Sequence, residues 1–102
     1  MIRLVVFACL LTTPAIAPVY AAETKAQSCG YQADVVAAIQ KARLDRVKER
    51  EVPKAIAATN PGWPENYNAA IPLIAPWVYD KKRKVLKTED LSAAWKDLCL
   101  QQ

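Results

Sequence analysis

Two cysteines, Cys29 and Cys99, constrain the fold of this chain more than any other feature of its sequence. They enclose nearly all of the residues able to form a folded domain, and a bond between them would close a loop of about 70 residues. The chain-entropy model assigns such a cross-link a stabilisation of about 4 kcal/mol. We therefore expect the first and last packed elements of the domain to be joined by one disulfide.

The first 21 residues have the organisation of a cleaved signal peptide. Arg3 supplies a positive start, Leu4–Leu11 is an apolar run too short to span a bilayer, and small residues follow. The predicted cut is after Ala21, with Ala22 as the next choice. The alternative is a lipoprotein, because the residues before Cys9 loosely resemble a lipid-attachment signal.

Residues 22–102 are predicted to form a single helical domain. Removing 21 residues from 102 leaves 81, a size at which a hydrophobic core alone gives little stability. Small exported domains commonly compensate with disulfides, which again favours a Cys29–Cys99 bond over the alternative of two free thiols. A Cys-x-x-Cys redox motif is absent from the sequence.

The apolar spacing in residues 22–102 is helical, and no run of alternating β-branched residues is present. The predicted fold class is all-α, a small bundle or orthogonal array of three long helices and one short helix. The helices are expected from about Tyr31 to Arg50, from Pro53 to Thr59, from Pro64 to the charged run 80–84, and from the N-cap Thr88 to Cys99.

Each predicted helix has an apolar face for the core. In the first it consists of Val35, Ala38, Ile39 and Ala42, and in the fourth of Leu91, Ala94, Trp95 and Leu98. The third has Tyr67, Ala70, Ile71, Ile74 and Val78, widened by Leu73 and Trp77. Pro72 and Pro76 lie opposite this stripe, so the segment is either one helix bent with its prolines outside or two short helices broken at Pro72.

The residue types argue against an enzyme. The chain has no histidine, its two domain thiols are expected to be oxidised, and Ser28 and Ser92 are the domain's only serines. Two glycines are too few for a phosphate-binding loop. The carboxylate pairs lie in solvated stretches of mixed charge. No catalytic, cofactor or metal residue is therefore assigned, and no cofactor is expected.

Three arginines form one candidate binding surface. Arg43, Arg46 and Arg50 are spaced to lie within about 60° of one another on a continuous helix, and guanidinium groups grip carboxylates and phosphates. The alternative is structural, with the arginine stems covering the core edge and their charges pairing internally. The acidic partners considered for that pairing are Glu89, Asp90 and Asp97.

A second candidate surface joins aromatic and basic residues. Trp77, Val78 and Tyr79 precede the cations Lys81, Lys82, Arg83 and Lys84, a combination that can rest on an anionic membrane. The favoured alternative is a core helix whose last turn carries cations suited to its negative end. Contact with a membrane surface is therefore allowed but not favoured.

Trp63 is the third candidate. It lies in a loop framed by Pro61 and Pro64, and large rigid aromatic rings anchor many protein interfaces. The alternative is that the ring covers one end of the core.

The charge balance favours a protein partner over nucleic acid. The chain has 14 basic and 10 acidic side chains, and loss of Arg3 with the signal leaves 13 against 10, a net charge of about +3. In an exported domain, so small a net positive charge does not indicate nucleic-acid binding. The sequence does not define an oligomeric state.

The pattern of Cys29, Val36, Ile39 and Ala42-Arg43, a central Tyr/Trp-rich helix and a closing Leu98-Cys99 resembles small exported proteobacterial proteins of uncharacterised function. That resemblance implies a periplasmic all-α domain with one disulfide and no activity. More remotely, the layout is similar to acid-stress periplasmic chaperones of the HdeA type and to periplasmic immunity proteins, by architecture only.

These observations predict a periplasmic or secreted, non-enzymatic helical binding module that engages or inhibits a protein partner. The alternative is an acid- or envelope-stress chaperone of the HdeA type. The two differ in acid, where a chaperone should lose tertiary order and expose apolar surface.

Export gives the first testable prediction. Mass spectrometry of the protein from its native envelope should find the N-terminus at Ala22 or Glu23, because the cut is expected after Ala21 or Ala22. An intact Met1 on soluble protein would contradict it.

Overall fold

A computed structural model describes residues 12–14 and 22–102, so the predicted signal peptide lies almost wholly outside the described residues. The described part is all-α, as predicted, and contains no strand. Among those residues, five α-helices and two short 3-10 helices follow one another. They are α1 (Lys25–Leu44), η1 (Glu49–Glu51), α2 (Val52–Ala57), η2 (Glu65–Ala70), α3 (Ile71–Tyr79), α4 (Arg83–Leu86) and α5 (Leu91–Leu100).

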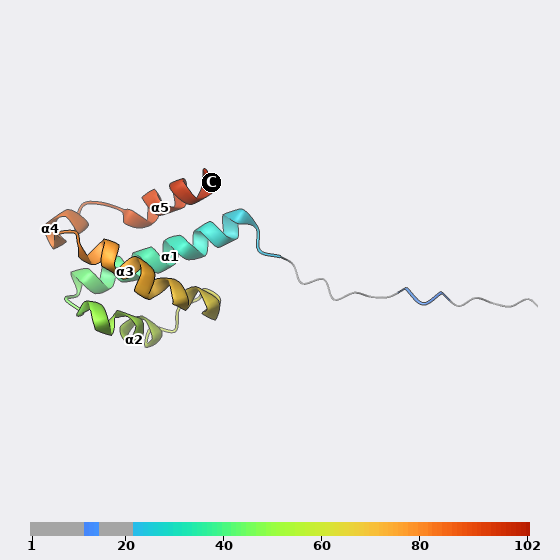
Figure 1. Cartoon of the computed structure of the whole chain (residues 1–102), viewed down its shortest axis with the longest axis horizontal. Coiled ribbons are helices and arrows are strands. Elements are labelled where there is room, and N and C mark those ends of the chain that lie inside the picture. The colour runs from blue at the N-terminus through green and yellow to red at the C-terminus, as the bar shows by residue number, and fades with distance from the viewer. Residues whose placement is uncertain (1–11, 15–21) are drawn as a thin grey trace, which may run out of the picture.

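Helix α1 lies at the centre of the fold, with α5 along one side and α3 and α2 along the other (Figure 1). Cys99 contacts Cys29 near the start of α1, while the N-terminus of α5 contacts Gln40 near its end, so α5 runs antiparallel to α1. The core lies between these helices. Its fully buried side chains are Val35, Val36, Ile39, Val52, Ile71, Val78 and Leu86.

Helix α1 begins and ends earlier than predicted. Thr24 is its N-cap and forms a reciprocal capping box with Gln27, so the helix starts at Lys25 rather than at Tyr31. At the other end, the amide of Val47 donates to the carbonyl of Ala42 and the amide of Arg46 to that of Arg43. This is a Schellman motif, in which Arg46 takes a left-handed φ of 64°.

The third helical segment changes its hydrogen bonding just before Pro72. Residues Glu65–Ala70 form a 3-10 helix and Ile71–Tyr79 an α-helix, with Pro72 in the first turn of α3 and Pro76 inside it. The dihedral angles of Ala70 and Ile71 stay helical, so one helical path continues through the change. Both prolines are exposed, as predicted for the bent helix.

Helix α5 packs through only part of the expected face, with Leu91 and Trp95 against the core but not Ala94 or Leu98. Its N-cap is Asp90 rather than Thr88, and the Asp90 carboxylate accepts from the amide of Ala93 at 3.0 Å. Leu91 is the only buried residue of this helix, whereas Ala94 and Leu98 are exposed. The disulfide explains the difference, because it turns Leu91, Trp95 and Cys99, spaced four apart, toward α1.

Two attachments hold the ends of α5 against α1. Near its C-terminus the disulfide joins Cys29 and Cys99, with their Cα atoms 5.6 Å apart. Near its N-terminus the Gln40 amide donates to the carbonyls of Leu86 and Glu89, at 2.7 and 2.6 Å, and accepts from the amide of Leu91. One side chain of α1 therefore satisfies three backbone groups in and before the first turn of α5.

Reduction of the disulfide should destabilise the domain. The bond closes a separation of 70 residues, and the chain-entropy model predicts a loss of about 4 kcal/mol for Cys99→Ser or for the reduced protein. Chemical denaturation with and without reductant measures the loss. The denaturation midpoint of the double variant Cys29→Ala/Cys99→Ala should be the same with and without reductant. An unchanged midpoint for the native protein on reduction would contradict the prediction.

Candidate interaction groove

An open groove runs between α5 and the segment formed by η2 and α3. Two adjoining hollows share Gln32 and Trp95 and together make up this surface, which we call the α3–α5 groove. Gln32 of α1 lies between the two walls. The α5 wall consists of Trp95, Leu98, Cys99 and Gln102, and the opposite wall of Asn66, Tyr67, Ala70, Leu73 and Ile74.

Leucines on both walls of the groove are exposed to solvent. Leu73 on α3 is 79% exposed and Leu98 on α5 is 62% exposed. Trp95, which both hollows share, packs against Trp77 of α3, with the two ring centroids 5.7 Å apart. Leu98 lines one of the two hollows and Leu73 the other. A single exposed leucine needs no explanation, but exposed apolar side chains in adjoining hollows are typical of an interaction site.

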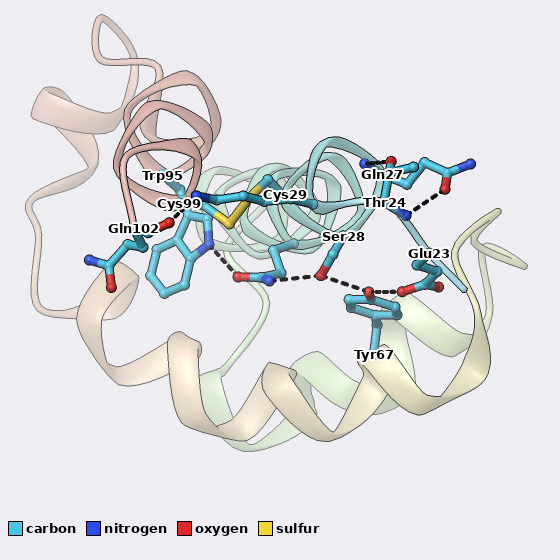
Figure 2. The surroundings of a disulfide bond; sticks show 11 residues. Glu23, Thr24, Gln27, Ser28, Cys29, Tyr67, Trp95, Cys99 and Gln102 are labelled. Atoms are coloured by element: carbon cyan, nitrogen blue, oxygen red, sulfur yellow. Dashed lines mark hydrogen bonds between the residues drawn. A yellow bond between two sulfur atoms is a disulfide. The ribbon is translucent and has the colours of Figure 1, made fainter. Parts of the chain in front are cut away.

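A continuous chain of hydrogen bonds lies along the floor of the groove (Figure 2). Trp95 Nε1 donates to Gln32 Oε1 at 3.0 Å, and Gln32 Nε2 donates to Ser28 Oγ at 3.2 Å. Ser28 Oγ lies 3.0 Å from the Tyr67 hydroxyl, which lies 2.5 Å from Glu23 Oε2. A phenol has one proton, and Tyr67 gives it to the carboxylate, so the serine hydroxyl donates to the phenol.

The chain therefore runs in one direction, from the indole to the carboxylate, and each member is paired. The hydrogen bond to Glu23 raises the pKa of the Tyr67 phenol above its usual value, while that from Ser28 opposes the shift. The phenol stays protonated at neutral pH. A segment entering the groove finds floor groups that already have partners.

The side chains that line the groove are uncharged, although Glu23 and Lys25 contact two of the lining residues, Tyr67 and Gln102. None of the side chains that line its two hollows is charged, although 24% of the whole chain is Asp, Glu, Lys or Arg. Lys25 Nζ donates to the carbonyl of Gln102, and Lys81 Nζ lies 5.2 Å from the centroid of the Trp77 ring. A lining depleted of charge is the composition found in the centre of protein interfaces.

The predicted arginine stripe does not exist, because α1 ends at Leu44. The three arginines therefore lie on different elements of the fold. Arg43 is in the last turn of α1 and is half-buried. Arg46 is exposed beyond the C-cap in its left-handed conformation, and Arg50 is exposed in η1. The prediction was wrong because it assumed that the helix continues to the Val52-Pro53 boundary.

Arg43 joins the end of α1 to the end of α3. Its guanidinium lies 5.2 Å from the centroid of the Tyr79 ring, and Nη2 donates to the carbonyl of Lys81 at 3.4 Å. The acidic side chains expected to pair with it do not, since Lys41–Asp45 is the one ion pair among residues 22–102. The Tyr79 hydroxyl donates to the carbonyl of Val47 at 2.6 Å. Burial raises the pKa of that phenol, and the charge of Arg43 opposes the rise.

The basic run 81–84 divides between two environments. Lys81 and Arg83 are half-buried, Lys82 is the exposed N-cap residue of α4, and Lys84 is exposed in that helix. The helix α4 itself was not predicted. The four cations follow the end of α3, but they do not form one flat basic surface with the aromatic residues, because Val78 is buried and Tyr79 half-buried.

Trp63 packs against the core. Its ring is half-buried beside the buried cluster, and its Nε1 donates to Asn68 Oδ1 at 2.8 Å. This arrangement matches the alternative in which the ring covers one end of the core. It leaves the α3–α5 groove as the site with the strongest geometric support.

The sequence analysis missed the groove although it named several of the residues that line it. It assigned Leu73, Trp95 and Leu98 to inner faces, since their spacing is helical. The missing signal was the position of Cys99. A cysteine that must face α1 fixes the rotation of α5 and leaves Leu98 at the edge of its packed face.

No metal-binding group of three or more His, Cys, Asp or Glu residues occurs in the described part of the chain. None of the helices described there is long and apolar enough to cross a membrane. No protein-family model, no curated protein and no solved structure matches the chain. The candidate site therefore rests on its own geometry.

Replacement of Arg43 should test its role in joining α1 to α3. Arg43→Ala removes the contact with Tyr79 and the packing of the arginine stem, so the free energy of unfolding should fall by about 1 to 2 kcal/mol. Thermal unfolding compares the midpoint of each variant with that of the wild type. Arg50→Ala, at an exposed position, is the control and should leave the midpoint nearly unchanged. Equal midpoints for the two variants would contradict a structural role for Arg43.

Proposed function

We propose that this protein is a non-enzymatic binding module that engages a protein partner through the α3–α5 groove. The observation that carries the proposal is the lining of the groove, which has no charged side chain and includes the exposed Leu98 in one hollow and the exposed Leu73 in the other. Burial of an exposed leucine side chain contributes about 1.5 to 3 kcal/mol. Two such side chains in adjoining hollows can supply much of the energy of a weak protein contact.

The form of the groove favours an apolar segment as its occupant. A groove between two helices suits the apolar face of a third helix, one of the recurring modes of peptide recognition. The floor groups of Trp95, Gln32 and Ser28 are already bonded to one another. Covering them with an apolar segment therefore costs less than covering the same groups unbonded.

The same bonding pattern supports binding rather than catalysis. The Ser28 hydroxyl and the Tyr67 phenol are members of the floor chain, and the pKa of the phenol is raised rather than lowered. The chain has no histidine to act as a base for either group. We therefore propose no catalytic role and no cofactor.

Export to the periplasm or the cell exterior is part of the proposal. The Cys29–Cys99 bond is compatible with an oxidising compartment, and residues 1–21 have the organisation of a signal peptide. The resemblance to small exported proteobacterial proteins supports the same location. We propose neither nucleic-acid binding nor membrane contact as the function.

Charge placed in the groove should abolish partner binding. With the mature domain as bait in envelope extract, Leu98→Glu should lose the captured protein because a carboxylate would be buried against the apolar walls. Leu100→Glu is the matched control, since Leu100 is 42% exposed but does not line the groove. Quantitative mass spectrometry compares the two eluates. Capture unaffected by Leu98→Glu would exclude the groove as the binding site.

A specific observation keeps the acid-stress chaperone as a second candidate. The N-terminus of α5 is capped by Asp90, and hydrogen bonds from the Ala93 amide and the Ser92 hydroxyl lower the pKa of that carboxyl group. A carboxylate therefore holds the first turn of the helix that forms one wall of the groove. Protonation would weaken that turn and expose apolar surface.

The sign of this pH dependence follows from the direction of the shift. Because the pKa of Asp90 is lower in the folded state, its stabilisation is complete above the unfolded value of about 4 and is lost as the pH falls through the folded value. Stability measured by denaturation should therefore decrease below about pH 4. Asp90→Asn keeps a capping side chain that does not titrate, so this variant should show a smaller decrease.

Dye binding separates the two candidate functions over the same pH range. An acid-activated chaperone should bind a hydrophobic dye strongly in acid as its tertiary packing is lost. A domain that stays compact and dye-free throughout would exclude the chaperone and leave the binding module.

A further inference from the structure

We propose that the Cys29–Cys99 bond is a redox latch for α5. A dithiol reductant opens the bond through Cys99, and the C-terminal half of α5 (residues 96–100) then leaves α1 while the rest of the core stays folded. The proposal concerns the fold of the oxidised and the reduced chain. It therefore goes beyond the proposed function and does not depend on what the groove binds.

The hydrophobic core is built almost entirely without α5. The cluster of buried side chains draws on α1, α2, α3 and α4, and Leu91 is its only member from α5. Trp95 packs against the cluster half-buried, and no residue beyond Trp95 belongs to it. Because hydrophobic burial is the main favourable term in folding, the cluster keeps its packing when residues 96–100 move away.

The contact between α1 and the C-terminal half of α5, which we call the seam, has a different composition. On α1 it contains Cys29 and Ala33, which lie one turn apart on the same face and are buried outside the main cluster. On α5, Leu98 is exposed and Cys99 is half-buried. The seam therefore buries only small side chains, and the covalent bond is its strongest interaction.

The hydrogen bonds across the seam add less. Trp95 Nε1 donates to Gln32, and Lys25 Nζ donates to the carbonyl of Gln102. The first bond is part-buried and the second exposed, so water replaces these partners when the seam opens. A helix of ten residues is also unstable by itself in water, so α5 loses helical order where it loses its attachment.

The start of α5 is held independently of the cysteines. The Gln40 amide bonds to the carbonyls of Leu86 and Glu89 and to the amide of Leu91, and the Leu91 side chain is buried. Reduction removes none of these contacts. The first turn of α5 is therefore the hinge about which the rest of the helix moves.

The exposure of the two cysteines decides where a reductant attacks. Cys29 is 1% exposed, whereas Cys99 is half-buried and lines an open hollow with Trp95 and Gln102 (Figure 2). A thiolate of the reductant attacks Cys99 Sγ, the Cys29–Cys99 bond breaks, and Cys29 leaves as a thiolate that takes a proton from water. The mixed disulfide is then attacked by the second thiol of the reductant. This step frees Cys99 as a thiol and leaves the reductant as its own disulfide, so two electrons pass to the protein.

Hydrogen exchange followed by mass spectrometry tests the proposal on the protein with and without dithiothreitol at neutral pH. Once both thiols are free, the amides of residues 96–100 should exchange about 30-fold or more faster, the factor at the lower end of what a disulfide contributes. The amides of residues 35–42 in α1 and of α3 should remain protected. A reduced protein that keeps its protection in α5, or that loses it in α1 and α3 as well, would overturn the proposal.

Trypsin gives an independent measurement, because Lys96 is the only lysine or arginine of α5. Cleavage after Lys96 should be slow in the oxidised protein and fast in the reduced one, since proteolysis requires local unfolding. Lys41, within α1, is the matched site and should resist cleavage in both forms. Equal cleavage rates after Lys96 in the two forms would overturn the proposal.

Two variants separate the latch from the hinge. Cys29→Ala/Cys99→Ala should show rapid exchange at residues 96–100 whether or not dithiothreitol is present. In oxidised Gln40→Ala the amide of Leu91, which donates to Gln40 Oε1, should lose protection while residues 96–100 keep theirs. Loss of protection at residues 96–100 in that oxidised variant would show that the disulfide does not hold this half of the helix, and the proposal would fall.

The point of attack is tested with a monothiol, 2-mercaptoethanol, which forms a mixed disulfide that it resolves only in a second encounter. After a brief reaction the free thiol is alkylated and the peptides are mapped by mass spectrometry. The mercaptoethanol adduct should be on Cys99 and the alkyl group on Cys29. The reverse assignment would overturn Cys99 as the residue through which the bond opens.

Discussion

The attachment of α5 to α1 is the constraint on which the rest of this structure depends. Leu91 is the only buried side chain of α5, and Trp95 packs half-buried against the core, so this helix buries few apolar side chains. Its two ends are held instead by the disulfide and by the Gln40 amide. These attachments fix both the position of α5 along α1 and its rotation about its own axis.

The groove follows from that arrangement. A helix held mainly at its ends does not need its whole apolar surface for the core, and Leu98 can remain in the groove wall. Trp95 then links the wall to the floor, because its ring contacts Trp77 while its Nε1 donates to Gln32. Sequence periodicity identifies which residues share a face of a helix but not which faces stay uncovered, so the groove could not be predicted from spacing alone.

The fold was predictable where local chemistry decides it. The Cys29–Cys99 bond, the helical class and the outer position of the prolines are confirmed. The earlier start of α1 was readable from the Thr24-x-x-Gln27 capping box. Its end at Leu44 was not, because no glycine, proline or asparagine marks the boundary and an arginine takes the left-handed position. The arginine stripe was wrong for that reason.

The central position of α1 also has a kinetic consequence. Helix α1 contacts helices from every later part of the domain, and its contact with α5 joins residues 70 apart. The loop of chain between them must lose conformational entropy before that contact contributes any stabilisation. The docking of α5 onto α1 is therefore slow relative to the formation of the individual helices. In the oxidised chain that loop is closed throughout unfolding, so α5 and α1 remain neighbours even when the domain is denatured. The oxidised chain therefore searches far fewer conformations on refolding than the reduced chain.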